Sequence, residues 1–201
     1  MYMDFSTSGS SELFQSRWPH NLLAQNEQPM IDHFVSTSSR RAVDNIGSME
    51  IHIRKAGFED LKHVLDHRRA MFDEMGFRDS GVLDRVEECS REYLTEALRS
   101  GAYRGWLAEG SDGQIVGGGG IVVAAWPGYP GENRAAKAWI LNMYTEPGAR
   151  RGGVAKRLLE VMIEWCRKEG FSAVSLHASS AGRPLYETVG FQQTNEMMLK
   201  L

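Results

Sequence analysis

The sequence has few of the features that would assign it to a secreted, membrane or metal-binding class. It contains only two cysteines, Cys89 and Cys166, in 201 residues, too few for a disulfide framework and not in a zinc-type spacing. No apolar run approaches the roughly 20 residues of a membrane span, and the N-terminus lacks a basic start followed by an apolar block. The net charge of −3 gives little reason to expect nucleic acid or an anionic membrane as a partner. We therefore expect a cytoplasmic protein without a metal site.

What is present favours one packed domain with an N-terminal extension. Hydrophobic residues make up 42% and charged residues 24% of the chain, the balance of a globular protein, and the length suits one domain plus a tail. Residues 1–48 are rich in Ser, Asn and Gln without an apolar period, so we predict a mobile tail before a domain over residues 49–201. An alternative, in which residues around Ile31 to Val35 dock as an extra helix, stays open.

The apolar spacing predicts an α+β domain. Alternation indicates strands and the three-to-four residue period indicates helices, and Asp112-Gly113 suits a hairpin turn. The predicted strands cover residues 50–54, 103–108, 114–124, 138–145, 173–177 and 191–201, and the predicted helices cover 58–75, 82–98, 152–168 and 181–188. Antiparallel hairpins followed by a single late β-α-β crossover favour a mixed, mostly antiparallel sheet flanked by helices.

The strongest chemical signal is the junction between the predicted strand 138–145 and the helix that follows. Arg150, Arg151, Gly152 and Gly153 stand at the entry to that helix, where free backbone N–H groups and the helix dipole favour an anion such as a pyrophosphate. A Walker P-loop is excluded because no Gly-Lys-Ser/Thr occurs there, and the glycine spacing does not fit a dinucleotide fingerprint. A plain glycine-bearing loop with solvent-exposed arginines remains an alternative from the turn alone.

Two motifs together resemble the GNAT superfamily of N-acetyltransferases. Arg150-x-x-Gly153-x-Ala155, after a strand and a proline, resembles the pyrophosphate-binding motif of that family, and Leu185 to Phe191, reading LYETVGF, resembles its LYEKLGF signature. The resemblance covers residues 51–201. It implies a GNAT fold whose crossover forms the acetyl-CoA site, and transfer of the acetyl group to a primary amine by direct attack in a ternary complex.

The resemblance also implies which residues bind acetyl-CoA. Backbone groups of the turn would hold the pyrophosphate, and the preceding strand would pair with the pantetheine arm as an added strand does. The implied cofactor-binding residues are Met143, Tyr144, Thr145, Arg150, Arg151, Gly152, Gly153, Val154, Ala155 and Ser179. Ser179 departs from the family pattern, because many members have an asparagine there.

The residue that the resemblance favours for catalysis is Tyr186, whose family counterpart protonates the departing thiolate. A phenol is protonated at neutral pH and can do so, although a tyrosine that only packs against the cofactor is the alternative. Glu146 is a weaker candidate for the proton acceptor, because it could equally be a loop charge. His177, at a strand end, could relay protons or be a structural histidine.

Several features carry less specific expectations. His63 and His67, four residues apart on a predicted helix, are expected to be solvated, because no third metal ligand accompanies them. The run Gly117 to Gly120 predicts a bulge or close packing against the cofactor or substrate. The segment from Arg68 to Glu74 borders the acceptor site in relatives of the family. From the residues alone, its charges are interpreted as those of a helix surface.

The sequence leaves the acceptor amine open. A small-molecule amine and a peptide amine are both compatible with it, and a homodimer is possible because relatives often dimerise. A function from a different class also stays open, namely an acyl-CoA-binding sensor or interaction module that keeps the cofactor pocket without turnover.

Overall fold

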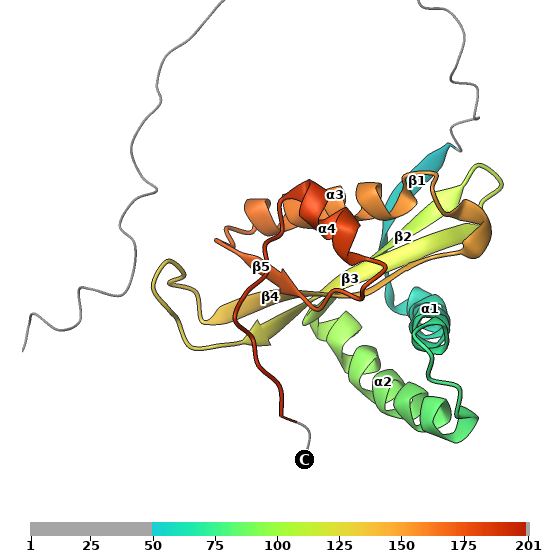
Figure 1. Ribbon diagram of the computed structural model, residues 1–201, viewed down its shortest axis with the longest axis horizontal. Coiled ribbons are helices and arrows are strands. Elements are labelled where there is room, and N and C mark those ends of the chain that lie inside the picture. The colour runs from blue at the N-terminus through green and yellow to red at the C-terminus, as the bar shows by residue number, and fades with distance from the viewer. Residues whose placement is uncertain (1–49, 200–201) are drawn as a thin grey trace, which may run out of the picture. The chain divides into compact units, whose positions relative to one another are not determined.

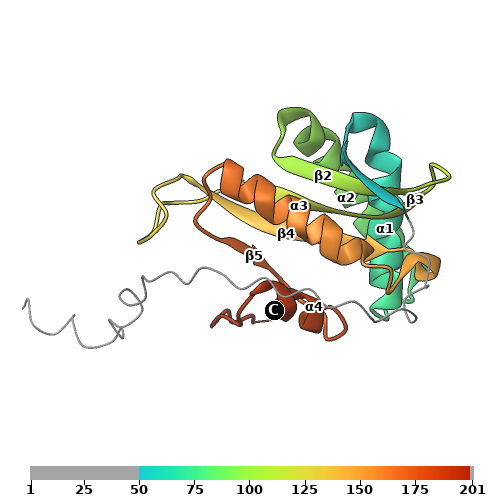
Figure 2. The same ribbon diagram turned by 90° about the horizontal axis from the view of Figure 1, so that it is seen from above.

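The computed structural model describes residues 50–199, in which one five-stranded sheet is covered by helices on both faces (Figures 1 and 2). The strand order is β1-β2-β3-β4-β5; the first four strands are antiparallel, and β4 and β5 are parallel. Helices α1 and α2 lie on one face and α3 on the other. The elements are β1 (Ile51–Ala56), the 3-10 turn η1 (Phe58–Asp60), α1 (Leu61–Glu74), α2 (Ser80–Ser100), β2 (Tyr103–Gly110), β3 (Ile115–Ala125), β4 (Ala136–Thr145), the 3-10 turn η2 (Pro147–Ala149), α3 (Val154–Lys168), β5 (Val174–Leu176) and α4 (Arg183–Val189).

This architecture confirms the predicted α+β class and most of the predicted elements. One prediction is wrong: residues 191–199 form no strand. The segment lacks an alternating apolar pattern, its end carries the largely exposed Met197, Met198 and Leu199, and β5, with three residues, offers a short edge for pairing. The predicted mobile tail and the alternative helix near Ile31 lie outside the described residues.

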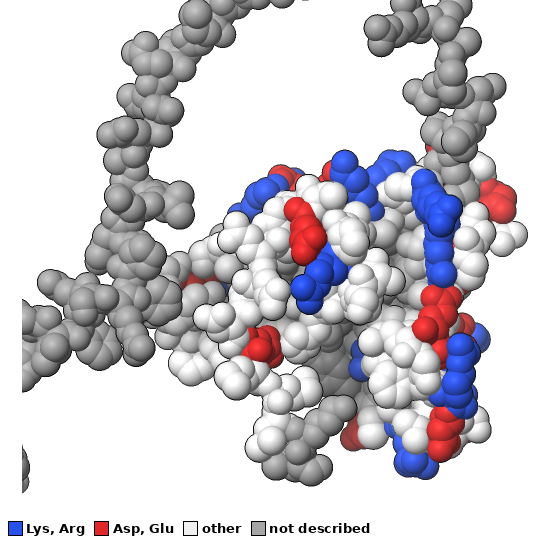
Figure 3. Space-filling model, in the orientation of Figure 1, with Lys and Arg blue, Asp and Glu red and all other residues white. Residues whose placement is uncertain are grey.

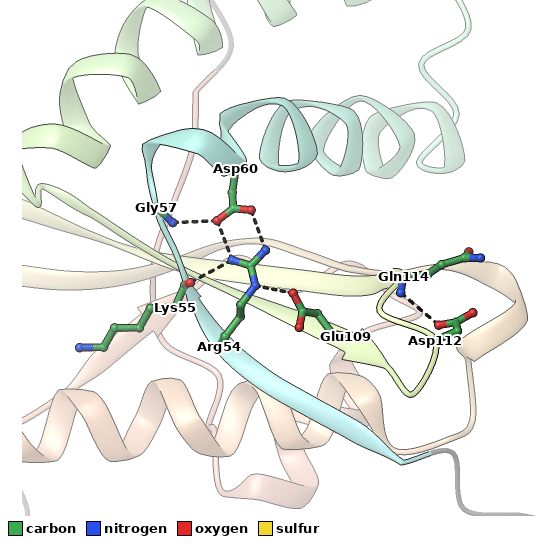
Figure 4. Close-up of polar contacts among 7 residues, drawn as sticks. All are labelled: Arg54, Lys55, Gly57, Asp60, Glu109, Asp112 and Gln114. Atoms are coloured by element: carbon green, nitrogen blue, oxygen red, sulfur yellow. Dashed lines mark hydrogen bonds and ion pairs between the residues drawn. The ribbon is translucent and has the colours of Figure 1, made fainter.

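A charged cluster fixes the connection from β1 to α1. Arg54 donates two hydrogen bonds to the buried carboxylate of Asp60, at 2.7 and 2.8 Å, and also pairs with Glu109 of β2 (Figure 4). Asp60 accepts a further hydrogen bond from the Gly57 backbone N–H at 2.9 Å. The guanidinium beside it holds the pKa of Asp60 below its usual value. The start of α1 is thereby anchored to the sheet.

The glycine run in β3 permits the sheet to approach its neighbours closely. Gly118 is opposite Tyr144 and Gly120 is opposite Leu141, so two residues of β4 face the single Gly119. The sequence predicted a bulge or a close packing contact at the glycine run, and the extra residue of the bulge lies in β4, opposite that run. Asn142 takes the left-handed conformation at this bulge, with φ of 58°, which Asn tolerates better than most residues. A Cβ at Gly120 would overlap the ring of Tyr103.

Two apolar clusters hold the helices on their faces. The α3 face buries Val154, Leu158, Leu159 and Met162 against the sheet, and each such side chain contributes roughly 1.5–3 kcal/mol through burial. On the other face, Val64 and Leu65 of α1 meet Leu94 of α2 and Tyr103 of β2, among other residues. The sheet therefore lies between two packed layers of helix. Within residues 50–199, no helix has the length and apolar character to cross a bilayer.

Candidate functional site

The junction between β4 and α3 forms a tight turn with unusual backbone geometry. After η2 the chain passes through Arg151, with φ of 62°, and Gly153, with φ of 81°, which is the N-cap of α3. Glycine adopts this left-handed conformation without the strain that a Cβ would add. The surroundings of Gly153 are also open: apart from its own chain neighbours, no heavy atom of residues 50–199 lies within 4 Å of where its Cβ would be. A ligand can therefore approach the main chain here.

The backbone N–H groups of this turn are available to an anion. Within residues 50–199, the N–H groups of residues 151–156 donate no hydrogen bond, whereas Ala149 N–H bonds to Glu146 and Arg157 N–H bonds to Gly153. Six consecutive free donors at the positive end of the α3 dipole suit a diphosphate. We call residues 150–156 the anion turn.

The two arginines of the anion turn are in different situations. Arg150 donates to the Thr145 carbonyl at 2.9 Å and to both carboxylate oxygens of Glu74, at 2.6 and 2.7 Å, so it ties the turn to α1. Arg151 is exposed and forms no ion pair in the described part of the chain. On the face drawn in Figure 3, acidic and basic side chains alternate along the right-hand edge, and others of both signs lie nearer the middle. Arg151 is the arginine whose charge is free for a ligand.

The strand before the anion turn has a free edge. Strand β4 pairs with β5 only from Ala138 to Ile140, so Met143, Tyr144 and Thr145 have no strand beside them on the β5 side among residues 50–199. Their other edge is paired with β3. A free edge that ends in an anion turn can accept an extended, phosphate-bearing molecule by main-chain hydrogen bonds.

The bulge at Asn142 borders a cavity of about 550 Å³ between α2 and the sheet, which we call the α2 cavity. Arg68 of α1 donates to Asn142 Oδ1 at 2.6 Å, and Asn142 Nδ2 donates to the Tyr103 hydroxyl at 3.2 Å. Burial raises the pKa of Tyr103 to about 12, so this phenol stays protonated. Three elements distant in sequence thus hold the bulge in place. Sequence reasoning treated Arg68 as a surface charge and missed this contact.

Tyr186 lies away from the α2 cavity. Its side chain lines a second cavity of about 780 Å³ between β4, β5, α4 and the C-terminal segment, and its ring packs edge-on against Phe191 with 5.8 Å between the ring centroids. Burial raises the pKa of the Tyr186 phenol, which keeps its proton in place. His177 lines the same cavity, where its Nε2 lies 3.0 Å from Glu196 Oε1. We call this the β5 cavity.

Glu146 points toward α1 and lines neither cavity. Its Oε1 lies 3.5 Å from Nε2 of His67. His67 is only 5% exposed, so the expectation that it is solvated is wrong; its ring packs beside Tyr144, and Gly118 lacks the Cβ that would crowd it. Burial, reinforced by the nearby His63, lowers the pKa of His67 to about 4, so at neutral pH this contact is not an ion pair.

The remaining predicted residue, Ser179, has a local contact. Its Oγ accepts a hydrogen bond from the Gly182 backbone N–H at 3.1 Å, just before α4. Its expected place beside the cofactor stays a prediction. In the described part of the chain, no three His, Cys, Asp or Glu side chains gather as metal ligands.

Comparisons with known proteins identify the family. The sequence profile of the acetyltransferase (GNAT) family matches residues 65–191. The structure is similar to a GCN5-related N-acetyltransferase from Ralstonia eutropha JMP134, at 32% identity and a TM-score of 0.71 over 76% of this chain and 99% of that one. It is also similar to a predicted acetyltransferase with acetyl-CoA from Clostridium acetobutylicum, at 26% identity and a TM-score of 0.68 over 76% and 96% of the two chains.

A human relative, N-acetyltransferase 8, is 26% identical over 114 residues. The match covers 55% of this chain and 46% of that protein, so the chain spans less than half the length of this relative.

Proposed function

This chain belongs to the acetyltransferase (GNAT) family, and on that premise we propose that it transfers the acetyl group of acetyl-CoA to a primary amine. The observation that carries the proposal is the anion turn at the end of a free strand edge. Six consecutive N–H groups without partners among residues 50–199 match the acceptor oxygens of a pyrophosphate. The adjoining edge, from Met143 to Thr145, matches the amides of a pantetheine arm.

Several features support this assignment of the cofactor site. Val154 and Ala155 contribute N–H groups from the first turn of α3, Gly152 and Gly153 leave the main chain uncovered, and Arg151 adds an exposed charge. Arg150 acts on the same site by bonding to the Thr145 carbonyl and Glu74, which fixes the turn relative to α1. We include Ser179 as a further contact on the strength of its family position.

In the proposed chemistry, the enzyme mainly positions the amine and the thioester and polarises the acetyl carbonyl. A neutral amine attacks the acetyl carbonyl in a ternary complex, and backbone N–H groups near the β4 bulge stabilise the charge that develops on the carbonyl oxygen. Tyr186, whose pKa is raised by burial, delivers a proton to the departing thiolate. The attacking amine must lose a proton, and we propose Glu146, acting through water, as the group that takes it. Glu146 lines neither cavity, which is why the proton reaches it through water.

Two measurements on the full chain test the proposal. Calorimetric titration should show saturable binding of acetyl-CoA, and thiol release should rise above the hydrolytic background when an amine panel is added. The panel should include polyamines, amino acids, aminoglycosides and peptide N-termini. Absence of acetyl-CoA binding would remove the proposal. Binding with no transfer to any amine would instead favour the acyl-CoA-binding sensor.

A further inference from the structure

The α2 cavity combines an apolar lining with positive charge. Helix α2 contributes Val82, Val86 and Leu94 at helical spacing, and the sheet contributes Val122 and Leu141. Among residues 50–199, the charged residues that line it are Arg68 and Arg85, and no Asp or Glu of that range lines it. Asp84 and Glu87, on either side of Arg85 and Val86, pair with Arg69 of α1 instead. A second cationic group inside this cavity would therefore be repelled, whereas an anion would be attracted.

Of the two arginines, Arg68 is the one whose contacts indicate an anionic ligand. Its Nε donates to Ser90 Oγ at 2.9 Å and one Nη to Asn142 Oδ1 at 2.6 Å, so both partners are neutral. It forms no ion pair with a carboxylate among residues 50–199, in contrast to its neighbour Arg69, which forms two. Burial lowers the pKa of Arg68, and its guanidinium lies over the Phe72 ring at 4.8 Å. A partly buried cation without an anionic partner is costly.

Arg68 keeps a donor group that its protein partners do not use. A guanidinium has five N–H donors, and parallel pairs of them match the two oxygens of a carboxylate. With Nε and one Nη engaged as described, the second Nη has no hydrogen-bond partner in the described part of the chain. A carboxylate here would accept hydrogen bonds from the unused donors of Arg68. The exposed Arg85, which also lines the cavity, would attract it at longer range.

The cavity also meets the proposed reaction centre. Leu141 and Asn142 line the α2 cavity and belong to the part of β4 that β5 leaves free. An α-amine is one carbon from its carboxylate, so a carboxylate bound at Arg68, which bonds to Asn142, keeps the amine beside the β4 edge. An apolar side chain would then extend along Val86 and Leu94. The volume of about 550 Å³ is within the range of small-molecule sites.

We propose that the acceptor is an amine-bearing carboxylic acid with an apolar body, of the type of a large apolar amino acid, and that Arg68 binds its carboxylate. This inference rests on the proposed function, because it identifies the acceptor class of the same site. It excludes polyamines and aminoglycosides as preferred acceptors, since both bring additional positive charge to the two arginines.

The test compares L-phenylalanine with phenylalaninamide, which has the same body without the negative charge. Acetyl transfer from acetyl-CoA is measured by thiol release, with rates expressed per concentration of neutral amine because the two amines differ in basicity. Binding of both compounds to the full chain is measured by calorimetry with and without CoA. We expect the acid to have at least a tenfold lower KM or Kd than the amide.

Variants of Arg68 separate carboxylate binding from a structural role at the bulge. Arg68→Met should reduce the acid-to-amide preference to within twofold, Arg68→Lys should restore part of it, and acetyl-CoA affinity should stay within threefold in both. Arg91→Gln is the control, because Arg91 lies on α2, pairs with Glu87 and does not line the cavity; it should retain the full preference. If Arg68→Met slows both amines equally and keeps their ratio, the residue is structural and the proposal is overturned.

The calorimetric arm keeps this inference independent of turnover. Equal or weaker binding of the acid relative to the amide overturns the carboxylate site even if the chain acetylates other amines, and the proposed function then stands alone. Preferential binding of the acid supports the site even if transfer is not seen. If the wild-type chain does not bind acetyl-CoA, that result would count against the proposed function and not against the Arg68 site.

Discussion

The anion turn and the α2 cavity are two halves of one proposed site, and they are built in opposite ways. The anion turn is a continuous segment, residues 150–156, whose donors are main-chain N–H groups. The α2 cavity draws Arg68, Ser90, Tyr103 and Asn142 from four separate elements, and its donors are side chains. In the proposed site, the turn would accept the diphosphate of any acyl-CoA, because its donors are backbone groups. The cavity can differ from one relative to the next because each side chain can change independently.

The largest expected effect lies in the turn. Ala155→Glu places a carboxylate in the first turn of α3, where the helix dipole tolerates it but a diphosphate does not. A pair of like charges at about 4 Å costs roughly 4 kcal/mol near a protein surface, so acetyl-CoA affinity should fall about 1,000-fold.

The matched control is Ala155→Gln, which has the same size without the charge. Calorimetric titration of acetyl-CoA should give Gln an affinity within about tenfold of the wild type. Equal losses in the Glu and Gln variants would show that bulk rather than charge decides binding, and the contrast between a charge-sensitive turn and a side-chain cavity would weaken.

The second effect concerns the stability of α1, the helix that supplies Arg68 to the α2 cavity. The pKa of His67 is lowered from 6.5 to about 4 by burial, so the unfolded chain binds its proton first as the pH falls. The stability from the neutral ring is therefore complete above pH 6.5 and is lost progressively down to about pH 4, by on the order of 3 kcal/mol.

His67→Gln should flatten this dependence. Denaturant unfolding at pH 7, 6, 5 and 4.5 measures the free energy of unfolding of both proteins, and the difference between their slopes isolates His67 from the carboxylates. Parallel slopes would mean that His67 takes up a proton in the folded protein as readily as in the unfolded one.

The third effect separates chemistry from binding. Tyr186→Phe removes the phenolic proton and keeps the ring that packs against Phe191, so kcat should fall about 100-fold, the low end for general acid catalysis. Acetyl-CoA affinity should stay within about threefold. Tyr129→Phe, in a loop lining neither cavity, serves as the control; an unchanged kcat in Tyr186→Phe would leave only the packing role.

The smallest effect is expected at Glu146, which lies against α1 and outside both cavities. Glu146→Gln keeps the size of the side chain beside His67 and removes its charge. If Glu146 accepts the proton through water, kcat/KM should fall about tenfold, and the acidic limb of the pH profile of kcat/KM should shift. A superimposable pH profile would reassign Glu146 to a contact with α1.

The sequence predicted the elements closely because each depends on local pattern. Helix α3 has apolar residues on one face and a glycine turn before it, the hairpin between β2 and β3 has Asp112-Gly113, and the anion turn has its donors within seven consecutive residues. The prediction of a strand over residues 191–201 was wrong for residues 191–199, the part that the structure describes. A strand needs a partner edge as well as a sequence that tolerates the extended conformation.

The assembled contacts could not be read from the sequence. Nothing local distinguishes Arg68 from Arg69, yet one lines the α2 cavity while the other faces Asp84 and Glu87. His67 looked solvated because its burial depends on Gly118 in β3 and Tyr144 in β4. Charge and burial at these positions are set by residues up to 77 positions away, as between His67 and Tyr144.

By itself, then, the sequence determined the α+β class, the crossover and the position of the anion turn, because short-range periodicity and backbone conformation decide them. Only the tertiary structure decided which arginine lines a cavity, which histidine is neutral and where Tyr186 lies, because desolvation and partner choice arise when distant segments pack together.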